Sequence, residues 1–127
     1  MIGVGCHHIS PFVFIVTLGV QVKESKFQAD LVRELNEIFV DVLVMKLDSS
    51  YMQGIPDLLI LHPNGWAVLE VKRSINEPFQ PNQEYYIDLL DQWSFAAMIA
   101  PENKEDVLHD LQSALRTRRQ TRVSVRK

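Results

Sequence analysis

The feature that most constrains this chain is a pair of apolar runs separated by a short turn sequence. Residues 57–62 and 66–72 are rich in Leu, Ile and Val, and Pro63-Asn64-Gly65 lies between them. Asn-Gly favours a two-residue hairpin turn, because both of its positions readily adopt a positive φ. The sequence therefore predicts an antiparallel β-hairpin with Asn64 and Gly65 as its two loop residues.

This hairpin would gather three charged side chains. In the predicted register Asp57 lies opposite Lys72, and Glu70 precedes Lys72 by two residues on the same strand. Side chains alternate between the faces of a strand, and directly opposed residues share a face. We therefore expect Asp57, Glu70 and Lys72 on one face, with Leu58 and Val71 on an apolar opposite face.

Two interpretations of these charges remain open. Asp57 and Lys72 could form a cross-strand salt bridge on a solvated face, which would add little stability. Alternatively, Asp57 and Glu70 could supply oxygen ligands to Mg²⁺, which commonly uses one or two carboxylates and bridges to substrate phosphate. Lys72 would then assist an attacking water or neutralise charge on phosphorus.

The rest of the chain predicts a single α/β domain. Apolar residues recur at helical spacing near the start, as in Phe27, Leu31 and Leu35, and near the end, as in Leu111 and Leu115. The predicted elements are helices at 23–40, 83–93 and 102–119, strands at 42–47 and 95–100 beside the hairpin, and a loop at 74–82. Their order is α-β-β-β-α-β-α.

Charge is distributed unevenly along the 127 residues. All 16 acidic residues fall in residues 1–115 with only seven of the 13 Lys and Arg, whereas the last twelve residues hold the other six. An acidic body with a basic tail is therefore expected, and two interpretations of the tail stay open: it contacts phosphates, or it is a solvated, frayed terminus. One cysteine excludes a disulfide scaffold and a Cys-based zinc ribbon.

The N-terminal region, residues 1–22, is an apolar segment expected to be a strand or an interface. Its longest apolar run, residues 12–20, is too short for a membrane span and has no basic flank typical of a signal peptide. We therefore expect a cytoplasmic protein with no membrane partner. The sequence also lacks a Gly-rich phosphate loop, so no nucleotide cofactor is expected.

Gly54-Ile55-Pro56-Asp57 followed by Glu70-Val71-Lys72 resembles the PD-(D/E)XK nuclease signature, in the form found in the VRR-NUC (virus-type replication-repair nuclease) group. That group also carries an acid and a glutamine in its first helix and a glutamine opening the helix after the hairpin. Glu24, Gln28 and Gln83 stand at those places. The resemblance covers residues 23–115 and implies a restriction-endonuclease-like αβββαβ core, with a mixed sheet flanked by helices.

The resemblance also implies roles for individual residues. Glu24, Asp57, Glu70 and the carbonyl of Val71 would bind Mg²⁺ or Mn²⁺. Lys72 would be the catalytic lysine, and Gln83 would contact the water or the phosphate. From the residues alone, Glu24 is either a helix-dipole partner or a group aimed inward, and Gln83 is most simply a first-turn polar residue beside an Asn82 cap.

The expected activity is metal-dependent endonucleolytic hydrolysis of branched or structured DNA, similar to that of Holliday-junction resolvases in repair and recombination. A homodimer in a bacterial or phage-infected cell is expected. Two alternatives stay open: a non-catalytic DNA-binding or assembly module of the same fold, and a sequence- or mismatch-directed endonuclease. The candidate DNA-binding residues are Gln28, Gln53, Arg73, Arg116, Arg118, Arg119 and Arg122.

Overall fold

A computed structural model describes residues 25–121, with side chains described as far as residue 116. The first helix occupies residues 25–38. It is followed by β1 (Leu43–Lys46), β2 (Leu58–His62), β3 (Gly65–Val71), α2 (Gln83–Trp93), β4 (Phe95–Ile99) and α3 (Lys104–Thr121). The order α-β-β-β-α-β-α predicted from the sequence is confirmed. The α/β class is confirmed as well.

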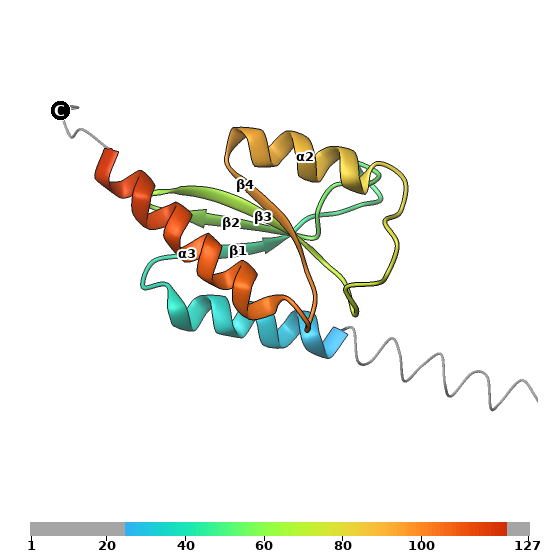
Figure 1. Ribbon diagram of the computed structural model, residues 1–127, viewed down its shortest axis with the longest axis horizontal. Helices are drawn as coiled ribbons and strands as arrows, with labels where there is room; N and C mark the ends of the chain where they lie inside the picture. Colours follow the sequence, from blue (N-terminus) through green and yellow to red (C-terminus); the bar gives the residue numbers. More distant parts are fainter. Residues whose placement is uncertain (1–24, 122–127) are drawn as a thin grey trace, which may run out of the picture.

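The four strands form one mixed sheet in the order β1-β2-β3-β4. β1 pairs antiparallel with β2, and β2 pairs antiparallel with β3, whereas β4 pairs parallel with β3. The change of direction follows from the connection, because β2 and β3 are joined by a hairpin whereas β3 and β4 need a crossover helix. That helix is α2, which lies on one side of the sheet while the first helix and α3 cover the other (Figure 1).

The hydrophobic core lies between the sheet and the pair formed by the first helix and α3. Leu31 and Leu35 from the first helix are at most 1% exposed, as are Leu111 and Leu115 from α3. They pack with the core-facing residues of the hairpin, Leu58, Ile60, Leu69 and Val71, in one cluster. The apolar positions predicted from helical and strand periodicity are therefore confirmed as core.

The predicted hairpin turn is wrong by one residue. His62 pairs with Gly65, so the loop consists of Pro63 and Asn64 and not of Asn64 and Gly65. Asn64 does not have a positive φ, since Asn82 is the only non-glycine residue with one in the described range. Proline explains the difference, because its fixed φ and missing N–H suit the loop and do not suit a paired strand position.

The corrected register moves each pairing by two residues, which preserves the faces. Leu58 pairs with Leu69, and continuing the ladder one step places Asp57 opposite Glu70, whereas the sequence had placed Asp57 opposite Lys72. A shift of one residue would have separated the charged side chains onto opposite faces. The prediction that Asp57, Glu70 and Lys72 share a face therefore survives the error in the turn.

The apolar segment expected at residues 1–22, as a strand or an interface, lies outside the described residues. α3 continues to Thr121, so the first part of the predicted basic tail is helical. Within residues 25–121, none of the helices combines the length and the apolar character that crossing a membrane requires.

Candidate active site

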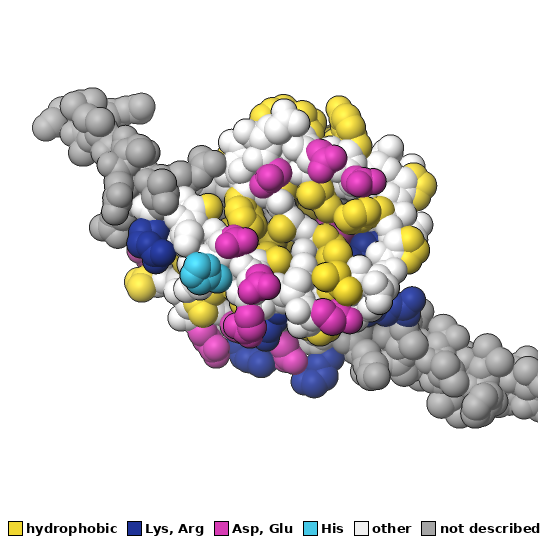
Figure 2. All heavy atoms as spheres, viewed as in Figure 1, with side chains coloured by type: hydrophobic (Ala, Val, Ile, Leu, Met, Phe, Trp, Pro, Cys, Tyr) yellow, Lys and Arg dark blue, Asp and Glu magenta, His cyan; other side chains and the backbone are white. Residues whose placement is uncertain are grey.

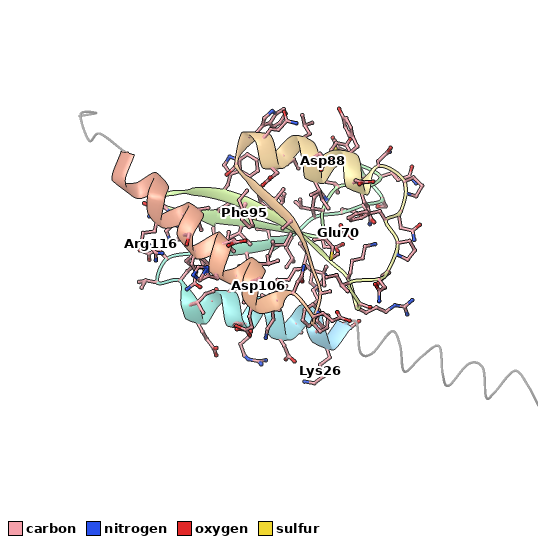
Figure 3. All side chains as sticks on the ribbon, viewed as in Figure 1. Lys26, Glu70, Asp88, Phe95, Asp106 and Arg116 are labelled. Atoms are coloured by element: carbon pink, nitrogen blue, oxygen red, sulfur yellow. The ribbon has the colours of Figure 1, made fainter. Side chains whose placement is uncertain are left out.

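The candidate site lies where β2 begins and β3 ends. Asp57 immediately precedes β2, and its Oδ2 accepts a hydrogen bond from the backbone N–H of Val71 at 2.9 Å. This bond ties the two strands together just outside their regular ladder and turns the carboxylate of Asp57 toward Glu70. Figure 3 shows Glu70 beneath the N-terminal end of α2.

Glu70 is a buried acid with an unsatisfied oxygen. Its side chain is 3% exposed, and its Oε2 accepts a hydrogen bond from Gln83 Nε2 at 2.8 Å. Its Oε1 is buried and accepts no hydrogen bond from any described residue. A buried carboxylate oxygen without a partner is costly, and native proteins usually supply a hydrogen bond, a water or an ion at such a place.

The pKa of Glu70 reflects the same environment. Burial raises the pKa of the Glu70 carboxyl to about 8, and repulsion from the neighbouring Asp57 carboxylate adds to the increase. The ammonium of Lys72 opposes it without reversing it. The Glu70 carboxyl therefore binds a proton near neutral pH when no metal ion is bound, and a bound metal ion would displace that proton.

Lys72 is buried to the same degree as Glu70, at 2% residue exposure, and is surrounded by acceptors. Its Nζ donates to Gln83 Oε1 at 2.8 Å and to the carbonyl of Pro78 at 3.2 Å. Carboxylate oxygens of Glu70 and Glu77 each lie 3.9 Å from the same nitrogen. This arrangement excludes the salt bridge on a solvated face, since Lys72 is buried and no ion pair joins it to Asp57 among the described residues.

Gln83 links the acid to the base. As the first residue of α2 it donates through Nε2 to Glu70, while its Oε1 accepts from Lys72 and from the backbone N–H of Gln80. One side-chain amide thus fixes the orientation of both charged groups. Gln83 therefore lies in the site beside Glu70 and Lys72, and its contact with the water or the phosphate stays a prediction.

Asn82 occupies the N-cap position of α2, as predicted beside Gln83, but its side chain does not cap the helix. Asn82 precedes α2 with a left-handed backbone (φ 71°, ψ −8°) and makes no capping hydrogen bond through its side chain. Its Nδ2 instead donates to the carbonyl of Gln53 at 3.5 Å. Asn82 therefore joins α2 to the loop that precedes Asp57.

Two loops form the rim of the site: the first rim loop (residues 48–56) and the second rim loop (residues 74–82). They meet at Gly54, where a Cβ would lie 2.5 Å from Asn82 Cβ and 2.8 Å from the carbonyl oxygen of Pro81. Gly54 also has a φ of +91°, which side chains disfavour. Glycine is therefore required for the two loops to approach each other.

The remaining predicted site residues differ in whether the structure describes them, in their exposure and in their contacts. Glu24 and Arg122 lie outside the described residues, and for Arg118 and Arg119 only the helical backbone is described. Gln28 is half-buried on the first helix, and no hydrogen bond in the described range joins it to the site. Gln53 and Arg116 are exposed. The guanidinium of Arg73 lies 3.5 Å from Glu77, so it is paired with a neighbouring acid.

Sequence reasoning missed the part played by the second rim loop. Glu77 accepts a hydrogen bond from the N–H of Arg73 and faces Lys72, and the ring of Phe79 lies 5.7 Å from Lys72 Nζ. The only available signal was the unusual length and proline content of this loop. A loop without periodicity gives no indication of which of its residues turn inward.

The donor set around Glu70 fits a hard divalent cation. Asp57 and Glu70 are both oxygen donors, and the unsatisfied Glu70 Oε1 is an acceptor for which the described protein supplies no donor. Mg²⁺ and Mn²⁺ prefer such ligands and need only one or two carboxylates from the protein. Among the described residues no cluster of three or more His, Cys, Asp or Glu is present, so a third side-chain ligand would come from outside them, as predicted for Glu24. The predicted carbonyl of Val71 would be a main-chain ligand.

Comparison of the chain with family models, with curated proteins and with solved structures found no match.

Proposed function

We propose that the protein is a divalent-metal-dependent nuclease of the PD-(D/E)XK type, which hydrolyses phosphodiester bonds in branched or structured DNA. The observation that carries the proposal is the group formed by buried Glu70 and Lys72 with half-buried Asp57 and Gln83, in which Glu70 Oε1 accepts no hydrogen bond from the described residues. A bound cation would satisfy that oxygen and would offset the repulsion between the carboxylates of Asp57 and Glu70. A site built to receive a cation leaves that oxygen available.

Each residue has a role that follows from its position. Asp57 and Glu70, where β2 begins and β3 ends, would hold Mg²⁺ or Mn²⁺. When bound, the metal would polarise the phosphate and lower the pKa of a bound water. The Val71 N–H holds Asp57 in place, and the Gln83 amide holds Glu70. These bonds orient both carboxylates before any substrate arrives, which reduces the cost of binding.

Lys72 is the cation that the protein itself supplies. Hydrolysis requires that a water oxygen bonds to phosphorus while the bond to the leaving oxygen breaks, and negative charge accumulates on the phosphate oxygens. An ammonium fixed by Gln83 Oε1 and the Pro78 carbonyl can donate to those oxygens with little reorganisation. The burial of Lys72 strengthens this interaction because the local dielectric is low.

The test is cleavage of a fluorescent four-way junction in Mg²⁺, with EDTA as the metal-free control. Asp57→Asn keeps an oxygen that can accept from the Val71 N–H but removes the charge, so it should fold normally and lose at least about 100-fold in rate. Glu37→Gln, an exposed position on the first helix, serves as the matched control and should cleave like wild type. Junction binding without cleavage in Mg²⁺ or in Mn²⁺ would support the non-catalytic alternative and contradict the nuclease mechanism.

A further inference from the structure

Aromatic side chains that the proposed hydrolysis does not use lie exposed around the rim of the site. Tyr51 in the first rim loop is 87% exposed and Phe79 in the second is 38% exposed. Tyr85, two residues after Gln83, is 61% exposed and rests edge-on against Tyr86. Exposed rings have a free face on which a planar group can stack.

The fold holds the ring of Phe79 next to Lys72 and places Tyr51 in the other rim loop. The ring of Phe79 lies 5.7 Å from Lys72 Nζ and contributes a cation–π contact. Tyr51 lies three residues before Gly54, whose backbone abuts Asn82, the neighbour of Gln83. The two rim loops therefore meet beside the site, with Tyr51 three residues before this contact in one loop and Phe79 three residues before it in the other.

The negative net charge of residues 1–115 disfavours nucleic-acid binding that depends only on contacts with phosphates. Residues 1–115 carry 16 acids and seven Lys or Arg, a formal charge of −9. In Figure 2 acidic side chains spread over the visible face, while Lys and Arg lie mainly along its lower border. Binding a duplex relies on many cation–phosphate contacts, and this body offers few of them. Stacking on unpaired bases adds binding free energy beyond the phosphate contacts, whereas the bases of a continuous duplex are already stacked on one another.

We propose that Tyr51 and Phe79 form a stacking platform for unpaired bases, so that the site engages single-stranded or frayed segments in preference to continuous duplex. The inference rests on the proposed nuclease function and specifies its substrate class. Every base presents a π-face, so the platform should be tolerant of sequence. A branched substrate would be engaged where its strands separate.

The test measures fluorescence anisotropy of a labelled oligodeoxythymidine of about 12 nucleotides and of a duplex of equal length. The full chain is used, with Ca²⁺ replacing Mg²⁺ to prevent turnover. Wild type should bind the single strand more tightly than the duplex. Tyr51→Ala should weaken single-strand binding about tenfold, and Tyr51→Phe should not. Because Tyr51 is almost fully exposed, its replacement should leave folding intact.

Trp93→Ala is the matched control, since Trp93 is 62% exposed at the end of α2 remote from Gln83. It should bind like wild type. Equal affinity of wild type and Tyr51→Ala, a preference for duplex, or no oligonucleotide binding at all would each overturn the platform. The last outcome would point to a protein partner for these rings.

The two proposals can fail separately. Cleavage that requires Asp57 but is indifferent to Tyr51 on every substrate would refute the platform and leave the nuclease in place. Tyr51-dependent binding of the single strand, together with no cleavage of the four-way junction in Mg²⁺ or Mn²⁺, would refute the nuclease and leave the platform.

Discussion

Replacing Glu70 with Gln tests the electrostatic account of the site, because it removes one of two neighbouring carboxylates with little change in shape. In the absence of metal, the Glu70 pKa is raised from 4.5 to about 8 by burial and by Asp57. A carboxyl whose pKa is raised on folding stabilises the protein below its unfolded pKa, and that stabilisation is lost as pH increases through the folded pKa.

The metal-free wild type should therefore lose stability between about pH 4.5 and about pH 8. One pKa unit corresponds to about 1.4 kcal/mol, so the whole displacement sets an upper limit of about 5 kcal/mol. Solvent and local relaxation reduce it, and we expect a loss on the order of 2–3 kcal/mol. Since small domains are stable by roughly 5–15 kcal/mol, this loss is readily measured.

Glu70→Gln should abolish most of this pH dependence, because the amide resembles the protonated carboxyl and has an N–H that can donate to Asp57. The variant should be more stable than wild type above about pH 8 in EDTA. Urea unfolding followed by tryptophan fluorescence, with and without Mg²⁺, measures the difference. Mg²⁺ should stabilise wild type increasingly as pH rises and should leave the variant nearly unchanged.

Glu37→Gln is the control for this series, since Glu37 is exposed on the first helix. A wild-type stability that is flat between pH 5 and pH 8 in EDTA would refute the reasoning. So would a Glu70→Gln variant that is less stable than wild type at every pH.

Three further substitutions test other parts of the structure by urea unfolding. Gly54→Ala should cost at least about 2 kcal/mol, because the new Cβ meets Asn82 and Pro81 at under 3 Å; a neutral result would show that the rim loops are not held together. Gln83→Ala should cost about 2–4 kcal/mol, since it removes hydrogen bonds to both Glu70 and Lys72, and unchanged stability would contradict the bridging role. Lys104→Met should change the free energy of unfolding by less than about 1 kcal/mol, although Lys104 lies 2.8 Å from Glu34. A larger loss would show that this partly exposed ion pair contributes more to stability than such pairs usually do.

The elements and core of this fold are largely readable from sequence. The periodic apolar residues of the first helix, of α3 and of the hairpin strands define buried faces by themselves, because the spacing of a helix or strand is fixed. The bounds of α2, Gln83–Trp93, match the prediction at both ends. The predicted turn is wrong because the constraint of Pro63, which does not suit a paired strand position, outweighs the preference of Asn-Gly for the loop.

The candidate site was only partly predictable. The shared face of Asp57, Glu70 and Lys72 follows from strand alternation, which a register error of two residues does not disturb. The burial of Glu70 and Lys72 does not follow, since it depends on the second rim loop folding over Lys72. The contacts of Glu77, Pro78 and Phe79 with Lys72 are set by tertiary packing of an aperiodic segment, and no local pattern encodes them.

Metal binding is the step on which the whole account depends, and electron paramagnetic resonance of Mn²⁺ measures it without any assumption about substrate. Titration of the full chain should show at least one bound Mn²⁺ per chain at pH 8, with Asp57→Asn and Glu70→Gln each losing most of the binding. Equal binding by wild type and both variants, or no binding by wild type, would contradict the assignment of Asp57 and Glu70 as a metal site.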